Sequence, residues 1–483
     1  MKKILISIPK LKRHKFIVLP DVIFEILNKI KIRGGELFIV GGVARDIVIS
    51  IINESRRGYP TKIKSKDLDL EPHGLSIEEI KLIVESSNIS VKEVGKSFGI
   101  IKCAPTEGFD IEIMPPRKEN KAGIGHRGFN VEIDTEMTFQ EAARRRDFTM
   151  NSMAINLNCR ELVDPFNGIE DLQSLTIRHT SDAFVEDWVR VLRMAQFAAR
   201  FDFQVAPRTM MIAREMEVDH WTVERVEIEF KKALMKINRP SVFFETLWNV
   251  GWIKKYFPLL AALKGCEQHT EWHPEGDVWN HTMLVVDAAA KFMAETAEDE
   301  EFKWTVMLAA LCHDLGKAFT TEKGVDEIIR SPRHDEAGIE PTRELLNKIV
   351  TKKSVIDEVV ALVKNHMTPQ SLFKSNPKHG AFRRLACRVD VQKLFWLSKS
   401  DRLGSLKERR VKDAPAEWLL EKIREAGVYD EPPEPILKGR HLLALGFKPG
   451  PKIGELLKIA FNYQLETGET DPEKLAQLAL KNR

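Results

Sequence analysis

The sequence predicts an α+β protein with its strands in the N-terminal part and helices in the remainder. Strand-like and helix-like segments alternate between Leu37 and about Thr180. Beyond that point apolar residues recur three and four positions apart, as at Val191 and Ala195, which is typical of amphipathic helices. A chain of 483 residues, 43% of them hydrophobic, is long enough for several domains with separate cores.

A glycine turn follows the first strong strand pattern. Residues 37–40 are a short apolar run that ends at Gly41 and Gly42. Glycine has no Cβ, so backbone N–H groups at such a turn can approach a phosphate. Arg45 and Asp46 then open a predicted helix whose positive dipole end lies near the same turn. The sequence therefore predicts a phosphate-binding turn.

Two carboxylates follow this turn on a predicted strand. Asp67 and Asp69 stand two positions apart, so they point to one face of the strand, where they can hold a hard cation. The alternative is a solvated strand edge. A glycine turn beside a paired-carboxylate site favours metal-dependent chemistry on a nucleoside triphosphate.

A second group of polar residues occurs in the helical half. His313 and Asp314 lie inside an apolar helical run, where a carboxylate is costly unless it is paired or binds a metal. Imidazoles and carboxylates together suit Ni, Mn, Fe or Zn. Further imidazoles and a carboxylate in this half of the chain stand at His281, His334, His366 and Asp401.

Composition narrows the partners and the compartment. Lys and Arg number 74 against 71 Asp and Glu, a net charge of +3, so RNA contacts require local basic patches. The five cysteines form no Cys-x-x-Cys pair, which favours a reducing compartment. We find no apolar run long enough to span a bilayer and no convincing signal peptide. The sequence predicts a cytoplasmic protein without membrane association.

Six motifs in order resemble class II nucleotidyltransferases of the tRNA CCA-adding and bacterial poly(A) polymerase family: GGVARD (41–46), KDLDL (66–70), RRDFTMN (145–151), DPFNGIEDL (164–172), EDWVRVLR (186–193) and ERV (224–226). Residues 272–404 resemble an HD phosphohydrolase domain, which some bacterial CCA-adding enzymes carry behind the transferase. This resemblance implies a metal site whose ligands occur in the order His281, His313, Asp314, His334, His366 and Asp401. The resemblance implies a nucleotidyltransferase head with a small mixed β-sheet and helices, an all-α neck and body, and an all-α HD domain.

The motifs and composition breaks divide the chain into five parts. We expect these to be an N-terminal extension, the catalytic head, a helical neck with the nucleotide template segment, the HD domain and a helical tail. Their predicted bounds are 1–30, 31–180, 181–264, 265–412 and 413–483.

The resemblance assigns catalysis to three carboxylates. Asp67 and Asp69 would carry Mg²⁺ for two-metal nucleotidyl transfer, and Glu112 matches the third carboxylate on a neighbouring strand. Asp110, two residues earlier on the same face, competes with Glu112 for that role.

The resemblance also implies how nucleotides bind. Arginine forks suit phosphate oxygens, whereas Asp and Asn can bind ribose hydroxyls. Asp187 and Arg190 would share a helical face and read the base, with an intrahelical ion pair as the alternative. The expected nucleotide-binding residues are Gly41, Gly42, Arg45, Asp46, Arg145, Arg146, Asp147, Asn151, Asp187, Arg190 and Arg193.

Further expectations concern a glycine-rich loop, a surface insertion and two groups of basic residues. The glycine-rich residues 123–129 match a mobile loop that helps to change specificity from C to A, and residues 53–65 read as a surface insertion. Basic residues that suit an acceptor stem occur at Arg214, Arg225, Lys231, Lys232, Lys236, Arg239, Arg383, Arg384, Arg388 and residues 407–412.

The favoured function is CCA addition to tRNA 3′ ends from CTP and ATP, without a nucleic-acid template. The HD domain, with a transition metal such as Ni²⁺ or Mn²⁺, would hydrolyse 2′,3′-cyclic phosphates or 2′-phosphates. Alternatives are a poly(A) polymerase, an enzyme adding only CC or only A, or an HD phosphohydrolase whose transferase half binds RNA. The resemblance also allows a homodimer through the HD domain.

Overall fold

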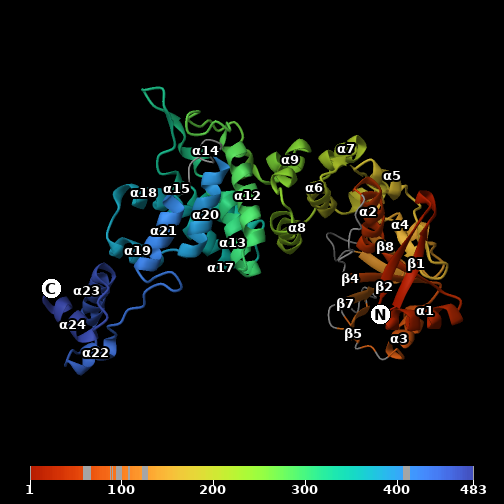
Figure 1. Ribbon diagram of the computed structural model, residues 1–483, viewed down its shortest axis with the longest axis horizontal. Helices are drawn as coiled ribbons and strands as arrows, with labels where there is room; N and C mark the ends of the chain where they lie inside the picture. The colour runs from red at the N-terminus through yellow and green to blue at the C-terminus, as the bar shows by residue number, and fades with distance from the viewer. Residues whose placement is uncertain are drawn as a thin grey trace. The chain divides into compact units, whose positions relative to one another are not determined.

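The computed structural model describes residues 2–57, 67–87, 89, 91–93, 101–106, 109–121, 129–405 and 414–481. The chain divides into two compact units, Met1–Trp221 and Thr222–Arg483. The α+β expectation is confirmed, because the large sheet belongs to the first unit and the second is almost wholly helical (Figure 1). Most of the glycine-rich loop (122–128), much of the predicted insertion (58–65) and the basic stretch 407–412 lie outside the described residues.

Nine of the described strands form one mixed sheet: β1 (Lys2–Ile8), β2 (Arg13–Leu19), β3 (Glu36–Val40), β4 (Asp67–His73), β5 (Val91–Glu93), β6 (Ile101–Thr106), β7 (Phe109–Ile113), β10 (Ala154–Asn156) and β11 (Glu161–Val163). Their order is β2-β1-β11-β10-β3-β4-β7-β6-β5. The sheet is larger than the small one expected. The β1–β2 hairpin, inside the predicted extension 1–30, lengthens it by parallel pairing with β11.

The helices of the first unit are η1 (Pro9–Leu11), α1 (Asp21–Ile32), α2 (Gly42–Arg57), α3 (Ile77–Glu85), α4 (Phe139–Ala143), η2 (Thr149–Asn151), α5 (Gly168–Gln173), η3 (Asp182–Glu186), α6 (Val189–Phe201) and α7 (Pro207–Glu215). Two short ladders join β8 (Arg117–Lys121) to β9 (Phe129–Ile133) and β12 (Thr176–Ile177) to β13 (Gln204–Val205). One apolar cluster joins the centre of the sheet to α4, with Phe38 stacked on Phe139 at 4.9 Å between ring centroids.

The second unit is a helical assembly with one small ladder. Its elements up to residue 425 are α8 (Val223–Met235), α9 (Ser241–Asn249), α10 (Trp252–Tyr256), α11 (Pro258–Ala261), α12 (Val278–Glu295), α13 (Glu300–Cys312), α14 (Lys317–Thr320), β14 (Glu322–Lys323), β15 (Ile329–Arg330), α15 (His334–Ala337), α16 (Ile339–Asn347), α17 (Lys353–Asn365), α18 (Thr368–Ser375), α19 (His379–Ala386), α20 (Val391–Gly404) and α21 (Ala414–Glu425). Helices α12, α13, α17 and α20 pack against one another (Figure 1).

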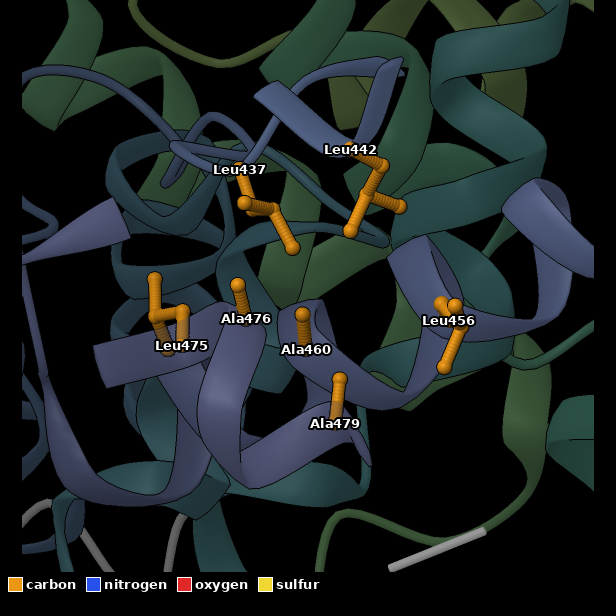
Figure 2. Close-up of a cluster of buried hydrophobic side chains, with 7 residues drawn as sticks. All are labelled: Leu437, Leu442, Leu456, Ala460, Leu475, Ala476 and Ala479. Carbon is orange, nitrogen blue, oxygen red and sulfur yellow. The ribbon is translucent and has the colours of Figure 1, made fainter. Parts of the chain in front are cut away.

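The chain ends in a small helical module with its own core. It contains α22 (Gly439–Ala444), α23 (Pro451–Thr467) and α24 (Pro472–Lys481). Figure 2 shows side chains of this core from all three helices and from Leu437 before them: Leu437, Leu442, Leu456, Ala460, Leu475, Ala476 and Ala479. Helix α23 packs on α19, where Arg384 Nη1 lies 2.6 Å from Glu466 Oε2.

The lengths of the helices and the state of the cysteines bear on two expectations from the sequence. None of the helices in the described ranges has the length and apolar character needed to cross a bilayer. All five cysteines fall in described segments and carry free thiols, in agreement with the absence of a disulfide framework.

Candidate active sites

The glycine turn of the first unit lies directly against a carboxylate. Strand β3 ends at Val40, which pairs with Asp69 across the β3–β4 ladder, and α2 begins at Gly42. Gly41 has a φ of +72°, and a Cβ at this position would lie 2.7 Å from Asp69 Oδ2. A side chain at position 41 would therefore push this carboxylate aside.

The carboxylate strands lie side by side in parallel register. Asp67 pairs with Asp110 and Asp69 pairs with Glu112 along β4 and β7. Glu112 is therefore the strand neighbour of Asp69, the carboxylate that touches the glycine turn. The side chain of Asp67 lies outside the described part of the structure.

Lys102 is a member of this site that our sequence analysis missed. It pairs with Glu112 in the β6–β7 ladder, and its ammonium forms an ion pair with the Glu112 carboxylate. The hydrogen bond to Glu112, assisted by the charges of Asp110 and Asp69, raises the pKa of Lys102. The carboxylates thus already hold a cation, and an oxygen donor set of this kind suits Mg²⁺. The pairing of β6 with β7 arises only in the folded sheet, and none of the sequence motifs includes Lys102.

Four predicted nucleotide-binding residues form one hydrogen-bonded chain. Arg193 Nη2 lies 2.6 Å from Asp147 Oδ2, and Asn151 Nδ2 donates to Asp147 Oδ1 at 3.0 Å. Arg45 Nη1 donates to Asn151 Oδ1 at 2.8 Å. Burial raises the pKa of Asp147, but the Arg193 charge and these hydrogen bonds lower it below its usual value. Asp147 is therefore a buried anion that joins α6 to the segment after α4.

Arg146 has a partner that the motif did not indicate. It donates from Nη2 to Glu71 Oε2 at 2.8 Å, and His73 Nε2 lies 2.9 Å from Glu71 Oε1. Glu71 is buried; burial raises its pKa, but His73 and Arg146 bring it below the usual value. The signal that could have found Glu71 is its position two residues after Asp69, on the same face of β4.

The base-reading segment differs from the expected helix. The prediction that Asp187 and Arg190 share a helix is wrong for Asp187, whose backbone is extended (φ −139°, ψ 105°). Its carboxylate accepts a hydrogen bond from Val189 N at 3.2 Å, and α6 begins at that residue. Arg190 donates to the carbonyl oxygens of Ala183 at 2.5 Å and Arg145 at 2.8 Å. Arg190 is thus held by backbone atoms of two segments that are far apart in the sequence.

In the second unit, the six predicted metal ligands come together from five helices. His281 lies on α12 and Asp401 on α20. His313 and Asp314 follow α13, His334 begins α15, and His366 follows α17. Two glycines permit these approaches: a Cβ at Gly316 would lie 1.9 Å from His334 O, and one at Gly404 would lie 2.3 Å from Val285 Cγ2 on α12.

The Asp314 carboxylate divides the histidines into two sets. Its Oδ2 atom lies 3.2 Å from His313 Nε2 and 3.7 Å from His281 Nε2. Its Oδ1 atom lies 3.4 Å from His334 Nε2 and 3.8 Å from His366 Nε2. Asp401 belongs to the first set, because its Oδ1 lies 3.0 Å from His281 Nε2 and 3.7 Å from His313 Nε2. Asp314 thus presents one oxygen to each set.

All four rings turn Nε2 toward the carboxylates. In three of them Nδ1 lies 2.6–3.0 Å from a backbone carbonyl oxygen, which fixes the tautomer with its lone pair on Nε2; the pairs are His313 with Ala310, His334 with Ser331 and His366 with Val363. The Nε2 atom of His313 is buried and receives no hydrogen bond from the described residues. Inward lone pairs beside two carboxylates fit a divalent metal ion.

Glu275 supports the fourth ring and was missed by our sequence analysis. Its Oε1 atom lies 2.9 Å from both His281 Nδ1 and His273 Nδ1. Burial raises the pKa of Glu275, but these two histidines lower it well below its usual value. A carboxylate behind a histidine is a common support for a metal ligand. Glu275 lies in the loop before α12, and no motif in the sequence marked it for this role.

Burial and neighbouring groups shift the pKa values of several residues in this cluster. Burial lowers the pKa of His281, but hydrogen bonds to Asp401 and Glu275 outweigh it and raise that pKa to about 9. Burial and the neighbouring His313 lower the pKa of His366 to about 4. Burial raises the pKa of Asp314, but its neighbours, His313 first and then Lys317, bring it well below its usual value.

A cavity of about 310 Å³ opens onto this cluster. Lys317 lies in its wall, with Nζ 2.7 Å from Asp314 Oδ2 and 2.8 Å from Gln268 Oε1. Trp272, Met367 and Arg402 also line the cavity. The cluster is therefore accessible to a small ligand on one side.

Two known protein families match regions of the chain that contain most residues of these two sites. The poly(A) polymerase head domain family matches residues 37–178, and the HD domain family matches residues 278–394. A multifunctional CCA protein of Mannheimia succiniciproducens is 35% identical over 322 residues, which are 65% of this chain and 70% of that protein. One from Acinetobacter baumannii is 32% identical over 363 residues, 74% of this chain and 79% of that protein.

Solved structures share the fold at low sequence identity. A CCA-adding enzyme in complex with ATP has a TM-score of 0.60 and 20% identity, covering 95% of this chain and 93% of that one. The Thermotoga maritima CCA-adding enzyme complexed with tRNA has a TM-score of 0.55 and 19% identity, covering 96% of each chain. These structures show the shared fold, and the curated relatives at 32–35% identity confirm the family resemblance inferred from the motifs.

Proposed function

This chain belongs to the family of multifunctional CCA proteins, and on that premise we propose that it adds C, C and A to tRNA 3′ ends from CTP and ATP. The observation that carries the proposal is the contact between the Gly41 turn and Asp69. It brings a phosphate-binding turn beside the carboxylates that would hold Mg²⁺, which are Asp67, Asp69 and Glu112. Bound there, divalent ions neutralise the charge that develops on the transferred phosphoryl group.

The remaining motif residues would bind and select the nucleotide. Arg145 and Arg146 would contact the triphosphate, and Asp147 and Asn151 the ribose. Asp187 and Arg190 would read the base, with Arg190 oriented by the carbonyl oxygens of Ala183 and Arg145. A base-reading arginine held by backbone atoms keeps one orientation at each addition. This supports protein-templated selection between CTP and ATP.

We propose that the second site is a metal-dependent phosphoesterase acting on 2′,3′-cyclic phosphates or 2′-phosphates at RNA ends. Its metal would be Ni²⁺ or Mn²⁺, held by His281, His313, Asp314 and Asp401 with His334 and His366 beside them. Residues of this set would hold the metal so that a water beside it has a lowered pKa and could act as the nucleophile. Lys317, bonded to Asp314, would attract the phosphate of the substrate.

The transferase proposal is tested with three tRNA transcripts, ending before CCA, after C and after CC. Each receives CTP, ATP or both with Mg²⁺, and the products are resolved at single-nucleotide length. Addition of C, C and A followed by a stop supports the proposal. Long A tails, or only CC or only A, would instead identify a poly(A) polymerase or a specialised enzyme.

The hydrolase proposal needs a separate test. An RNA ending in a 2′,3′-cyclic phosphate is incubated with protein loaded with Ni²⁺ or Mn²⁺, and an Asp314→Asn protein is the control. Loss of the cyclic phosphate in the wild type alone supports the hydrolase proposal.

We propose that the protein acts in the cytoplasm. We also propose a homodimer through the HD domain, which light scattering would check.

A further inference from the structure

One tryptophan stands apart from the others in the described structure. The chain has nine tryptophans, all within the described ranges, and Trp272 alone is classed as exposed, with 57% of its surface accessible. Trp252 and Trp279, by contrast, are 1% and 0% exposed. More than half of the surface of Trp272 is accessible, so a ligand that covers this surface gains the stabilisation that burial provides. Trp272 lines the cavity that opens onto the histidine cluster.

The position of Trp272 relative to the cluster is fixed on several sides. Its backbone N–H donates to His269 O at 3.0 Å, and Ser405 Oγ donates to Trp272 O at 3.2 Å. The next residue, His273, packs edge-on against the His281 ring at 4.9 Å between centroids. His273 also shares the Glu275 carboxylate with His281. Trp272 is thus the neighbour of His273, which contacts the same Glu275 carboxylate as the proposed metal ligand His281.

The cavity combines three features that suit different parts of one ligand. The histidines and carboxylates suit the phosphoester, and the side chains of Lys317 and Arg402 add positive charge for phosphate oxygens. Trp272 adds an exposed aromatic face. Every nucleobase has a π-face, and stacking on an aromatic side chain is the usual way in which proteins bind bases without reading their sequence.

We propose that Trp272 is the stacking platform for the nucleobase of the substrate, so that the second site selects nucleoside phosphoesters over phosphoesters without a base. This inference rests on the proposed phosphoesterase function of the same site. The phosphoester lies at the cluster, and the base of the terminal nucleotide lies on the indole. A cavity of about 310 Å³ suits one nucleotide at a time.

The test compares wild type, Trp272→Ala and Trp272→Phe in the full-length, Ni²⁺-loaded protein. Hydrolysis of a nucleoside 2′-monophosphate is measured against that of glycerol 2-phosphate, which has no base. We expect Trp272→Ala to raise the KM for the nucleotide about 5- to 100-fold, with Trp272→Phe in between. We expect kcat and the KM for glycerol 2-phosphate to stay unchanged. A short RNA with a 2′-phosphate end shows whether the platform serves RNA ends as well as free nucleotides.

Two controls separate this inference from a structural defect. Metal content by mass spectrometry and the thermal midpoint should match the wild type in both Trp272 variants. Phe16→Ala removes an aromatic side chain of similar exposure, 53%, from the first unit and should change nothing. Equal loss on both substrates, or no change on either, would overturn the inference.

The outcomes also distinguish this inference from the proposed hydrolase function. If the wild type hydrolyses glycerol 2-phosphate and the nucleotide but Trp272→Ala has an unchanged KM for each, only the platform is wrong. If the wild type hydrolyses neither, the hydrolase function fails. Calorimetric titration of the nucleotide into wild type and Trp272→Ala then still decides, because equal affinities would exclude the platform.

Discussion

His334 Nε2 lies 3.1 Å from His366 Nε2, and the Nδ1 atom of each ring lies within hydrogen-bond distance of a backbone carbonyl oxygen. Two imidazole lone pairs therefore face each other across a short distance in a buried cluster. Such a pair is unfavourable unless a cation or a proton lies with it. His334 and His366 would therefore share one cation on the Oδ1 side of Asp314, beside the set of His281 and His313 on the Oδ2 side.

We expect His366→Ala to lower the metal content of the purified protein and its thermal midpoint in Ni²⁺. The variant removes one inward nitrogen and leaves the other without a partner. Mass spectrometry of the metal-loaded protein is the measurement. His379→Ala is the matched control, because His379 is an exposed residue outside the cluster, 3.3 Å from Glu425. Identical metal content in the two variants would contradict this role.

Metal uptake by the HD site should increase with pH up to about pH 9. Without an ion, the raised pKa of His281, about 9, keeps a proton on this ring at neutral pH. A divalent ion must displace that proton, so each step toward higher pH favours binding. Calorimetry in buffers of different ionisation heat would count the released protons. A pH-independent affinity between pH 6 and 9 would exclude His281 as a ligand.

The two sites should fail independently. Asp69→Asn removes a charge beside the Gly41 turn and is expected to lower nucleotide incorporation by at least about 100-fold while phosphoesterase activity persists. Asp314→Asn should give the opposite pattern. Both variants are assayed for both reactions. Parallel loss of the two activities in either variant would show that the sites are coupled or that the protein is misfolded.

Glu71→Gln should weaken the support of Arg146. The buried carboxylate accepts a hydrogen bond from Arg146 and contacts His73, and a charged hydrogen bond contributes about 1.5–3 kcal/mol. We expect a KM for ATP raised about tenfold and a lower denaturation midpoint. Glu170→Gln, at an exposed position of α5, is the control. Unchanged nucleotide kinetics in Glu71→Gln would mean that Arg146 needs no such support.

The core of the C-terminal module should be sensitive to the shortening of its buried side chains. Leu475 is fully buried in the cluster shown in Figure 2, so Leu475→Ala is expected to cost about 2–5 kcal/mol of the module's unfolding free energy. Leu445→Ala, at a leucine that is 59% exposed, should be near neutral. Hydrogen exchange of residues 436–481 reports on the module alone. Equal exchange in the two variants would argue against an independent core.

The sequence predicted which residues gather in the second site but not their arrangement. The order of His281, His313, Asp314 and Asp401 could be read directly, because imidazoles and carboxylates in an apolar helical region are costly without a purpose. How Asp314 divides the histidines depends on the packing of five helices, which no local pattern records. Glu275 was missed for the same reason, since its importance arises only from its contact with His281.

The first unit shows the same limit. The spacing of Val191 and Ala195 predicted a helix, and both residues lie on α6, because apolar spacing is a local property. The β1–β2 hairpin and the position of Lys102 depend on pairing between strands far apart in the sequence. The helix expected to include Asp187 begins only at Val189, whose backbone N–H donates to the Asp187 carboxylate. Periodicity alone does not record this contact.

The carbonyl contacts of three HD-site histidines have a consequence for how such a centre can arise. In each case Nδ1 contacts the carbonyl oxygen three residues earlier, in the pairs His313–Ala310, His334–Ser331 and His366–Val363. Each ring orientation is therefore set within a segment of four residues. The packing of the helices then has to set only the distances between the rings. A helical protein could acquire or lose such a centre by small shifts between helices, without inventing a new way to aim each ring.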